Sequence, residues 1–169
     1  MANAVAWGAP LAAERQNVGQ VATREFVSDS AGMSEQHAYQ ELQCYTLAHG
    51  DPRFVHQHVV DAWVAQHADE QTKPIGLTFA LVGLYLRVEK GLSGRQVQRV
   101  HMALARRKRN WPAFALPRDR GAITAHEVIA APAGPARDQA IDTWCASAWA
   151  AFKDTHQAVA DLLEQHGIA

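Results

Sequence analysis

The chain contains few cysteines, almost no net charge and no apolar run long enough to cross a bilayer. Its two cysteines, Cys44 and Cys145, lie far apart in the sequence and form no Cys-x-x-Cys pair, so neither a disulfide framework nor a zinc ribbon is indicated and a reducing cytoplasm is favoured. The 16 basic and 17 acidic residues leave a net charge of -1, so no overall field attracts nucleic acid or an anionic membrane. The longest apolar run, residues 75–88, contains Arg87 and is shorter than a membrane span. We therefore expect a cytoplasmic protein without membrane association.

Helical periodicity runs through most of the chain. With 169 residues and 48% hydrophobic content, the chain has the size of one ordinary domain. Residues 1–32 are rich in Ala, Gly, Gln and Val without a sustained period, which predicts a flexible N-terminal arm. In residues 33–169, apolar side chains recur at spacings of three and four, and no strand-like alternation competes with them. The sequence therefore predicts a single all-α domain, a bundle of about five to six helices.

Proline and small polar residues mark where several helices begin. Ser34 is a predicted N-cap of the first helix. Asp51, which precedes a proline, opens the second helix, and Thr72, two residues before a proline, opens the third. Thr124 and Glu127 have the spacing of a capping box, which predicts the start of a short fifth helix.

Two of the predicted helices have a high apolar content. The third helix, about residues 75–90, is apolar on nearly every side, which predicts a helix buried at the centre of the bundle. The last helix begins at Pro135 and is predicted to be the longest, because one amphipathic ridge continues along it. That ridge consists of Ile141, Cys145, Trp149, Phe152, His156, Val159 and Leu163. On this ridge, Cys145 is predicted to be a buried thiol and not a nucleophile.

The second helix carries three histidines, an aspartate and a tryptophan within four turns. Histidines and carboxylates that face inward from neighbouring helices form the metal sites of helical bundles. His56 and His67 return to nearly the same face as Trp63, but they lie roughly 16 Å apart along the axis and cannot share an ion. His58 and Asp61 are three residues apart and form the one pair with ligand spacing. Candidate ligands therefore lie on two faces of one helix.

His156 occupies a ridge position where Leu or Ile is usual, so its ring needs a partner. The first interpretation is a packed core histidine with one hydrogen bond, to a backbone carbonyl or to Asp61. The second is a site for a divalent metal or a small ligand. The candidate residues of that site are His56, His58, Asp61 and His156. The third interpretation is a general base in catalysis.

The other histidines have simpler interpretations. His67 lies at the predicted C-terminal end of a helix, where the helix dipole favours a partly charged imidazole. His101 and His126 are predicted to lie at the surface.

One basic cluster ends the fourth predicted helix. It consists of Arg106, Arg107, Lys108 and Arg109. Clusters of this kind contact phosphates in nucleic-acid-binding proteins. At the end of a helix, however, the same cations oppose the carbonyl dipole, and no recognised nucleic-acid module surrounds them. We therefore interpret the cluster first as a solvated helix end and second as a nucleic-acid contact.

Three blocks of the sequence resemble a bacterial family of small helical proteins of unknown function. The blocks read Asp-Pro followed by His-x4-Asp-Ala-aromatic-x2-Gln-His, then Gly-Leu-x-Leu-x2-Glu-x-Gly, and finally Trp-x4-Trp-x6-His. The matching residues are Asp51, Pro52, His56, Asp61, Ala62, Trp63, Gln66, His67, Gly83, Leu84, Leu86, Glu89, Gly91, Trp144, Trp149 and His156. The resemblance implies an all-α fold and favours His56, Asp61, His67 and His156 over His58 as functional residues, but it implies no activity. Many members of that family begin with a cysteine-rich segment that looks zinc-binding and carry another histidine in the third helix. This chain has no such cysteines and has Phe79 or Ala80 at about that histidine's place, which weakens a metal assignment carried over from the family.

The sequence leaves three classes of function open. The preferred one is a helical domain that binds a partner protein or a small ligand through a pocket lined by histidine and aspartate. The candidate residues of that pocket are His56, Asp61, Trp63, His67 and His156. The alternatives are a metal-binding protein or metal-dependent enzyme, which would use His56, Asp61 and His156, and a nucleic-acid-associated factor, which would use residues 106–109. An apolar face left uncovered, with Trp7 or Trp111, would indicate a homodimer.

Overall fold

The structure is a computed structural model that describes residues 22–48, 50–107 and 110–168. Residues 1–21, which make up most of the predicted N-terminal arm, lie outside the described residues. The chain divides into two units, Met1–Met33 and Ser34–Ala169. The second unit contains every predicted site residue.

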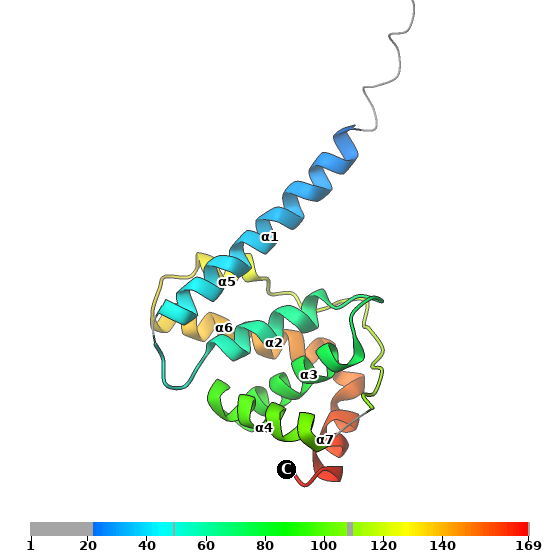
Figure 1. Cartoon of the computed structure of the whole chain (residues 1–169). Coiled ribbons are helices and arrows are strands. Elements are labelled where there is room, and N and C mark those ends of the chain that lie inside the picture. The colour runs from blue at the N-terminus through cyan, green and yellow to red at the C-terminus, as the bar shows by residue number, and fades with distance from the viewer. Residues whose placement is uncertain (1–21, 49, 108–109, 169) are drawn as a thin grey trace, which may run out of the picture. The chain divides into compact units, whose positions relative to one another are not determined.

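Seven α-helices and no strands make up the regular structure of the described residues (Figure 1). They are α1 (Ala22–Ala48), α2 (His56–His67), α3 (Pro74–Val88), α4 (Gly94–Arg107), α5 (Ala125–Ala130), α6 (Pro135–Ala151) and α7 (His156–Gln165). A short 3-10 helix, η1 (Lys153–Thr155), lies between the last two. The all-α prediction is confirmed, whereas the predicted number of five to six helices is too small.

One predicted capping residue begins its helix and the others do not. Thr72 does not cap α3, whose N-cap position is Lys73 without a side-chain bond. Pro74 is the first residue of α3. Thr124 and Glu127 form the predicted capping box, in which the Thr124 side chain accepts from the Glu127 amide and the Glu127 carboxylate accepts from the Thr124 amide. By contrast, α1 begins at Ala22 and runs through Ser34, and α2 begins only at His56 because the preceding residues form a turn.

The predicted long C-terminal helix is wrong, because the chain breaks between α6 and α7. In a continuous helix, Trp149 and His156 would lie about 10 Å apart along the axis. Their rings instead stack at 3.7 Å between centroids and 5° between planes. This contact requires the break, at which the Phe152 amide donates to the Trp149 carbonyl at 3.0 Å and the Thr155 hydroxyl donates to the Phe152 carbonyl at 2.8 Å. The apolar spacing continues across the break, which explains the error.

Helix α3 packs against α2, α4, α6 and α7. Its buried residues are Leu77, Thr78, Ala80, Leu81, Val82, Gly83, Leu84 and Leu86. Both ends reach the surface, since Ile75 and Val88 are 38% and 37% exposed. Within residues 22–48, 50–107 and 110–168, no helix is long and apolar enough to cross a membrane.

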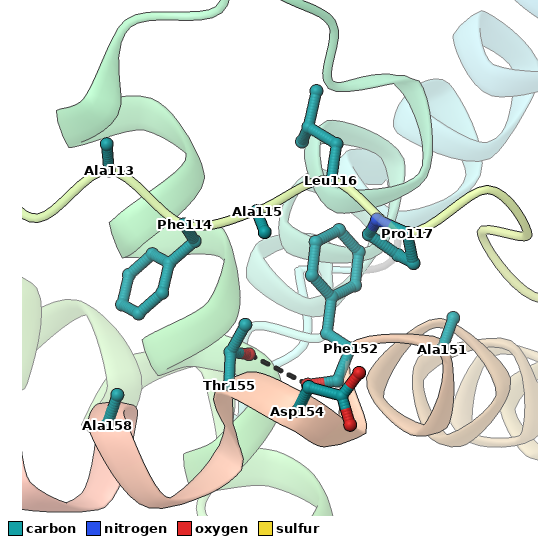
Figure 2. A pocket seen from close by; sticks show the side chains of 10 residues that line it. All are labelled: Ala113, Phe114, Ala115, Leu116, Pro117, Ala151, Phe152, Asp154, Thr155 and Ala158. Atoms are coloured by element: carbon teal, nitrogen blue, oxygen red, sulfur yellow. Dashed lines mark hydrogen bonds between the residues drawn. The ribbon is translucent and has the colours of Figure 1, made fainter.

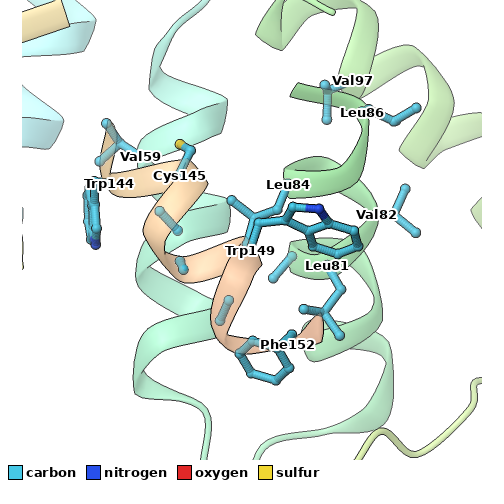
Figure 3. Close-up of a cluster of buried hydrophobic side chains, with 14 of the residues drawn as sticks. Val59, Leu81, Val82, Leu84, Leu86, Val97, Trp144, Cys145, Trp149 and Phe152 are labelled. Atoms are coloured by element: carbon cyan, nitrogen blue, oxygen red, sulfur yellow. The ribbon is translucent and has the colours of Figure 1, made fainter. Parts of the chain in front are cut away.

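The hydrophobic core lies mainly where α2, α3 and α6 pack against one another, and Figure 3 shows part of it. Two tryptophans of α6 are buried there, and each places its indole N–H on a polar partner. Trp144 donates to Gln66 Oε1 at 2.9 Å, and Trp149 donates to Glu89 Oε1 at 2.8 Å. A buried indole needs such a partner, because an unpaired N–H costs about 1–3 kcal/mol. These bonds tie α6 to α2 and to the end of α3.

His101 is buried, which corrects its predicted place at the surface. It is 8% exposed, and its ring stacks on Phe79 with 4.8 Å between centroids. The reason is the register of α4, in which Val97, His101 and Leu104 share the face that packs into the core. Burial lowers the pKa of His101 to about 4. His126, in contrast, is exposed as predicted.

Candidate ligand-binding site

A hollow of about 300 Å³ lies where polar side chains from α2, α3 and α6 meet, and we name it the His58 hollow. It is lined by Arg53, Val55, His58, Arg87, Gly91, Ser93, Gln96, Asp138 and Asp142. The core helices α2, α3 and α6 each contribute a titratable or charged side chain to it. Polar side chains thus converge on one small space from segments that are distant in the sequence.

His58 forms the most buried part of this lining. The residue is 2% exposed, and its Nδ1 atom is buried without a hydrogen-bond partner among the described residues. Burial, followed by the positive charge of Arg87, lowers the pKa of His58 to about 4. The imidazole is therefore neutral at neutral pH. A neutral ring nitrogen left unpaired in the interior costs about 1–3 kcal/mol unless another group satisfies it.

Arg87 and Asp142 form an ion pair beside His58 that joins α3 to α6. Arg87 donates to a single carboxylate oxygen, Asp142 Oδ1, from Nε at 2.9 Å and from Nη2 at 2.6 Å. Within the described part of the chain, Arg87 Nη1 and Asp142 Oδ2 make no hydrogen bond. The pair is partly open to solvent, with side chains 28% and 38% exposed. Each partner therefore keeps one atom available for a further polar contact.

The rim of the hollow is built by the turn that leads into α2. The Arg53 amide donates to Asp51 Oδ1 at 2.8 Å, and Phe54 adopts a left-handed backbone conformation with φ of 59°. Gly94 closes the turn from α4, because a Cβ at that position would lie 1.9 Å from the Phe54 carbonyl oxygen. The Arg95 amide then donates to the Arg53 carbonyl at 2.9 Å. The turn is thereby fixed to the start of α4.

A second hollow, of about 310 Å³, adjoins the first and shares Arg53, Val55 and Asp138 with it. We name it the Tyr45 hollow; its other lining residues are Tyr45, Thr46, Asp51, Pro52 and Gly134. The Tyr45 hydroxyl donates to Asp138 Oδ1 at 3.0 Å and accepts from the Gly134 amide at 2.9 Å. Asp138 therefore lies on the border between the two hollows, held from the Tyr45 side.

A third hollow, of about 330 Å³, has a different character (Figure 2). Leu116 and Pro117 of the loop after α4 lie over the Phe152 ring, and Phe114 of the same loop lies on the side of Ala158. Asp154 and Thr155 are the polar residues of its lining. The Thr155 hydroxyl donates a hydrogen bond to the Phe152 carbonyl at 2.8 Å. The lining is largely apolar, and none of the predicted site residues belongs to it.

Asp61 lies one turn beyond His58 on α2, but it faces helix α3 at close range. A Cβ built on Gly83 would lie 2.0 Å from Asp61 Oδ2, so the carboxyl group occupies the space that only glycine leaves. Gln57 Nε2 donates to Asp61 Oδ1 at 2.9 Å, while Oδ2 has no hydrogen-bond partner in the described part of the chain. Burial raises the pKa of this carboxyl well above its usual value. Asp61 is thus a packing residue of the α2–α3 contact.

His56 and His67 each have a local partner. The Thr46 hydroxyl donates to the Leu42 carbonyl at 2.9 Å, so His56 Nδ1, 2.9 Å from Thr46 Oγ1, acts as the donor in that bond. His67 ends α2 as predicted, and its Nδ1 donates to the Trp63 carbonyl at 3.1 Å. Burial lowers the pKa of both histidines.

Trp63 lies in the middle of an aromatic stack. Its ring stacks on His67 with 3.5 Å between centroids and on Tyr39 of α1 with 4.2 Å. The planes of Trp63 and Tyr39 differ by only 8°. The stack therefore joins α2 to α1. Trp63 has a structural role in this contact.

His156 belongs to a packed contact at the α6–α7 break. Besides stacking on Trp149, its Nε2 lies 2.9 Å from the Trp149 carbonyl and must donate to it, because a carbonyl only accepts. The structure thus places His156 as a packed histidine with one bond to a backbone carbonyl, the first of the interpretations drawn from the sequence. None of the three hollows is lined by His156 or by Asp61.

The predicted metal ligands are dispersed. His56 points to α1, His58 lines the polar hollow, Asp61 faces Gly83, and His156 covers Trp149. In the parts of the chain that the structure describes, no group of three or more His, Cys, Asp or Glu side chains could hold a metal ion.

Cys145 is a buried thiol, as predicted. It is fully buried, and its thiol donates to the His58 carbonyl at 3.6 Å. Burial raises the pKa of this thiol.

The basic cluster is described only in part. Arg106 and Arg107 are exposed at the end of α4, while Lys108 and Arg109 lie outside the described residues. Arg107 Nη1 donates to the carbonyl of His166 after α7, so one of the four cations contacts the C-terminal segment.

The sequence interpretation missed the ion pair beside His58. In the sequence, Arg87 is only a charge that interrupts an apolar run, and Asp142 follows Ile141 without any motif. One signal was available: a charged residue inside an apolar helix requires a partner on a neighbouring helix. The identity of that partner depends on the packing of α3 on α6, which spacing within one helix does not reveal.

Comparison with known proteins agrees with the absence of an assignable reaction. No curated protein and no solved structure is similar enough to the chain to match it. A family model described as a family of unknown function, DUF5946, matches residues 31–153, a range that includes α2, α3, α4, α5 and α6. The chain therefore belongs to the DUF5946 family of unknown function.

Proposed function

We propose that the protein is a binding protein that holds a small polar molecule in the His58 hollow. The observation that carries this proposal is a buried histidine, 2% exposed and with an unpaired Nδ1 among the described residues, in the lining of a polar hollow of about 300 Å³. Ligand sites are typically concave and contain a few convergent polar groups that orient the ligand. A site of this kind agrees with a pocket lined by histidine and aspartate, although its residues differ from those first favoured.

The polar groups of the hollow are held in place before any ligand arrives. The Arg87–Asp142 bond links α3 to α6, and Asp138 is held by the Tyr45 hydroxyl. We take α3 as the central helix of the bundle, because it packs against α2, α4, α6 and α7. Side chains on such rigid elements lose little conformational entropy when a ligand binds, which favours affinity.

The neutral state of His58 limits the chemistry of the site. A neutral imidazole offers one donor and one acceptor, so it can bind a hydroxyl, an amide or a carboxyl group without adding charge. Because burial and Arg87 lower its pKa to about 4, this state persists throughout the physiological range. We therefore expect binding that changes little between pH 6 and 8 and that weakens as the pH approaches 4.

The proposal is tested by ligand-observed NMR with a panel of small polar molecules, namely amino acids, carboxylic acids, sugars and nucleosides. The variants are His58→Gln, which removes the imidazole, and His126→Gln, which makes the same change at an exposed position. We expect at least one compound to bind the unaltered protein and the His126→Gln variant, and to lose at least about tenfold in affinity in His58→Gln. The proposal fails if no compound of the panel shows binding that depends on His58.

A second readout covers the case in which His58→Gln does not fold. Amide chemical shifts of the unaltered protein, recorded with the bound compound, should change at Ser93, Gln96 and Asp142, which line the hollow. Shifts confined to the apolar hollow near Phe114 would locate binding elsewhere and contradict the proposal.

A further inference from the structure

The lining of the His58 hollow carries equal numbers of positive and negative side chains, and its ion pair leaves bonding atoms of both partners unused. The lining holds two arginines, Arg53 and Arg87, and two aspartates, Asp138 and Asp142, beside a histidine that is neutral at neutral pH. A ligand with a single charge would leave one sign of this lining uncompensated. A binding site discriminates between ligands in this way, because a ligand that pairs with every charge of the lining binds more tightly than one that leaves a charge unpaired.

We infer that the ligand of the His58 hollow is a small zwitterion of the amino-acid type, whose carboxylate binds Arg87 and whose ammonium group binds Asp142. This inference rests on the proposed binding function and names its ligand class. The Arg87–Asp142 bond uses Nε and Nη2 on one side and Oδ1 alone on the other. A zwitterion can therefore bond to Arg87 Nη1 and to Asp142 Oδ2 while the ion pair stays intact, and each added bond is charge-assisted.

The neighbouring space accounts for the rest of such a ligand. The Tyr45 hollow adjoins the His58 hollow across Arg53, Val55 and Asp138, and it presents the side chains of Tyr45, Val55 and Pro52. A ligand whose charged end lies at Arg87 and Asp142 would extend an apolar side chain along these residues. The two volumes, about 300 and 310 Å³, lie at the small end of the range for ligand pockets, which agrees with a single amino acid.

Three compounds of similar shape test whether the carboxylate and the ammonium group are each needed for binding, without any change in the protein. L-phenylalanine carries both charges, phenethylamine lacks the carboxylate, and 3-phenylpropionate lacks the ammonium group. Isothermal titration calorimetry on the full chain at pH 7 would compare their affinities, with L-leucine and L-alanine as zwitterions with smaller side chains. We expect at least one of the three amino acids to bind, and L-phenylalanine to bind at least about tenfold more tightly than either singly charged analogue.

Variants of the ion pair provide the second half of the test. Arg87→Gln should remove the preference for the carboxylate, and Asp142→Asn the preference for the ammonium group, so that each variant binds L-phenylalanine and one singly charged analogue with similar weak affinity. Glu164→Gln, an exposed carboxylate on α7, is the matched control and should bind as the unaltered protein does. Thermal unfolding of each variant would show whether it is folded.

The outcomes distinguish this inference from the proposed function. If none of the three amino acids binds, or if one singly charged analogue binds as tightly as L-phenylalanine, the zwitterion inference is overturned. The binding function would still stand if another compound of the polar panel bound in a manner dependent on His58. If no compound at all bound in that manner, both would be wrong.

Discussion

His58 and Asp61 lie one turn apart on α2 and have opposite surroundings. Each is buried, at 2% and 3% exposure, and each has one side-chain atom without a hydrogen-bond partner among the described residues. His58 borders a polar hollow of about 300 Å³, whereas Asp61 lies so close to Gly83 that a methyl group would not fit between them. A residue with an unpaired buried atom therefore lines a hollow in one case and packs against a helix backbone in the other.

Under the proposed function, an unpaired buried atom bears on ligand binding only where there is room for a ligand. At Asp61 the close packing and the raised pKa together favour a protonated carboxyl group, whose burial costs far less than that of a carboxylate. At His58 the neutral ring borders a space that other polar side chains also line. Experiments that alter one environment and leave the other unchanged would separate the two roles.

The largest loss of stability is expected from Gly83→Ala. The added Cβ would lie 2.0 Å from Asp61 Oδ2 and 2.4 Å from its Cγ, so the α2–α3 contact has to open. We expect the free energy of unfolding, measured with urea, to fall by about 3 kcal/mol or more. Gly76→Ala in the same helix is the control, because its nearest neighbour would be Thr72 Cγ2 at 4.0 Å. That variant should be neutral or slightly more stable, and equal losses in both variants would contradict the packing role of Asp61.

The next effect is a gain in stability in Asp61→Asn that grows with pH. Because burial raises the pKa of Asp61, the folded state binds a proton that the unfolded state has lost above pH 4, and stability declines as the pH rises toward the folded pKa. Asparagine keeps the acceptor for Gln57 without titrating. The variant should therefore gain about 1.4 kcal/mol relative to the unaltered protein for each pH unit above 4, until the native carboxyl ionises.

Urea unfolding at pH 5, 6 and 7 would measure this slope. Asp154→Asn, on the exposed η1 segment, is the control and should show no comparable gain, because a solvated carboxylate contributes little. A constant difference between Asp61→Asn and the unaltered protein at all three pH values would show that Asp61 is ionised in the folded state.

A smaller effect with the opposite pH dependence is expected at His58, whose contribution to stability is lost as the pH falls. Its folded pKa of about 4 lies below the ordinary value of 6.5, so its contribution to stability is complete above pH 6.5 and is lost as the pH falls toward 4. At pH 5 this loss amounts to about 2 kcal/mol, and His58→Gln should escape it. Measurement of the unfolding free energy at pH 7.5 and pH 5 would give the difference between the two proteins.

His101 contributes in the same direction, since burial lowers its pKa to about 4 as well. The double variant with His101→Gln should therefore lose less stability on acidification than either single variant. If His58→Gln loses as much stability between pH 7.5 and pH 5 as the unaltered protein, the imidazole is already solvated in the native state.

The smallest effect is expected from His156→Ala. The variant loses the ring stack on Trp149 and one hydrogen bond to its carbonyl, which together contribute about 1–2 kcal/mol. Ligand affinity at the His58 hollow should not change, because His156 does not line it. Gln157→Ala, the exposed neighbouring residue, controls for the loss of a side chain at the start of α7. A loss of ligand affinity in His156→Ala would assign His156 to the site after all.

Local signals in the sequence predicted the fold class and several helix boundaries. Pro74 and the Thr124–Glu127 capping box begin helices as expected, because their effects depend on neighbouring residues alone. The break after α6 was not predictable from periodicity, since Trp149, Phe152 and His156 have the same spacing on a continuous helix. It depends on the stacking of His156 on Trp149, a contact that forms only when the helix has already ended.

The candidate site was predictable only in its residue types. The sequence indicated His58 as part of a ligand pair with Asp61, because the two share a helix face. Which of them borders a hollow depends on what α3 presents opposite each one: Gly83 against Asp61, and Arg87 at the edge of the hollow beside His58. Spacing along one helix carries no information on the residues across an interhelical contact. The ion pair with Asp142 was missed for the same reason.

The contact between Gly83 and Asp61 also restricts how the sequence can change over time. A residue larger than glycine at position 83 can be accepted only after position 61 has become smaller, because the carboxyl group occupies the intervening space. A change from aspartate to a small residue at position 61 first leaves a cavity, which a larger side chain at position 83 can then fill. Substitutions at the two positions are therefore expected to accumulate in one order, with the residue of α2 changing before the residue of α3.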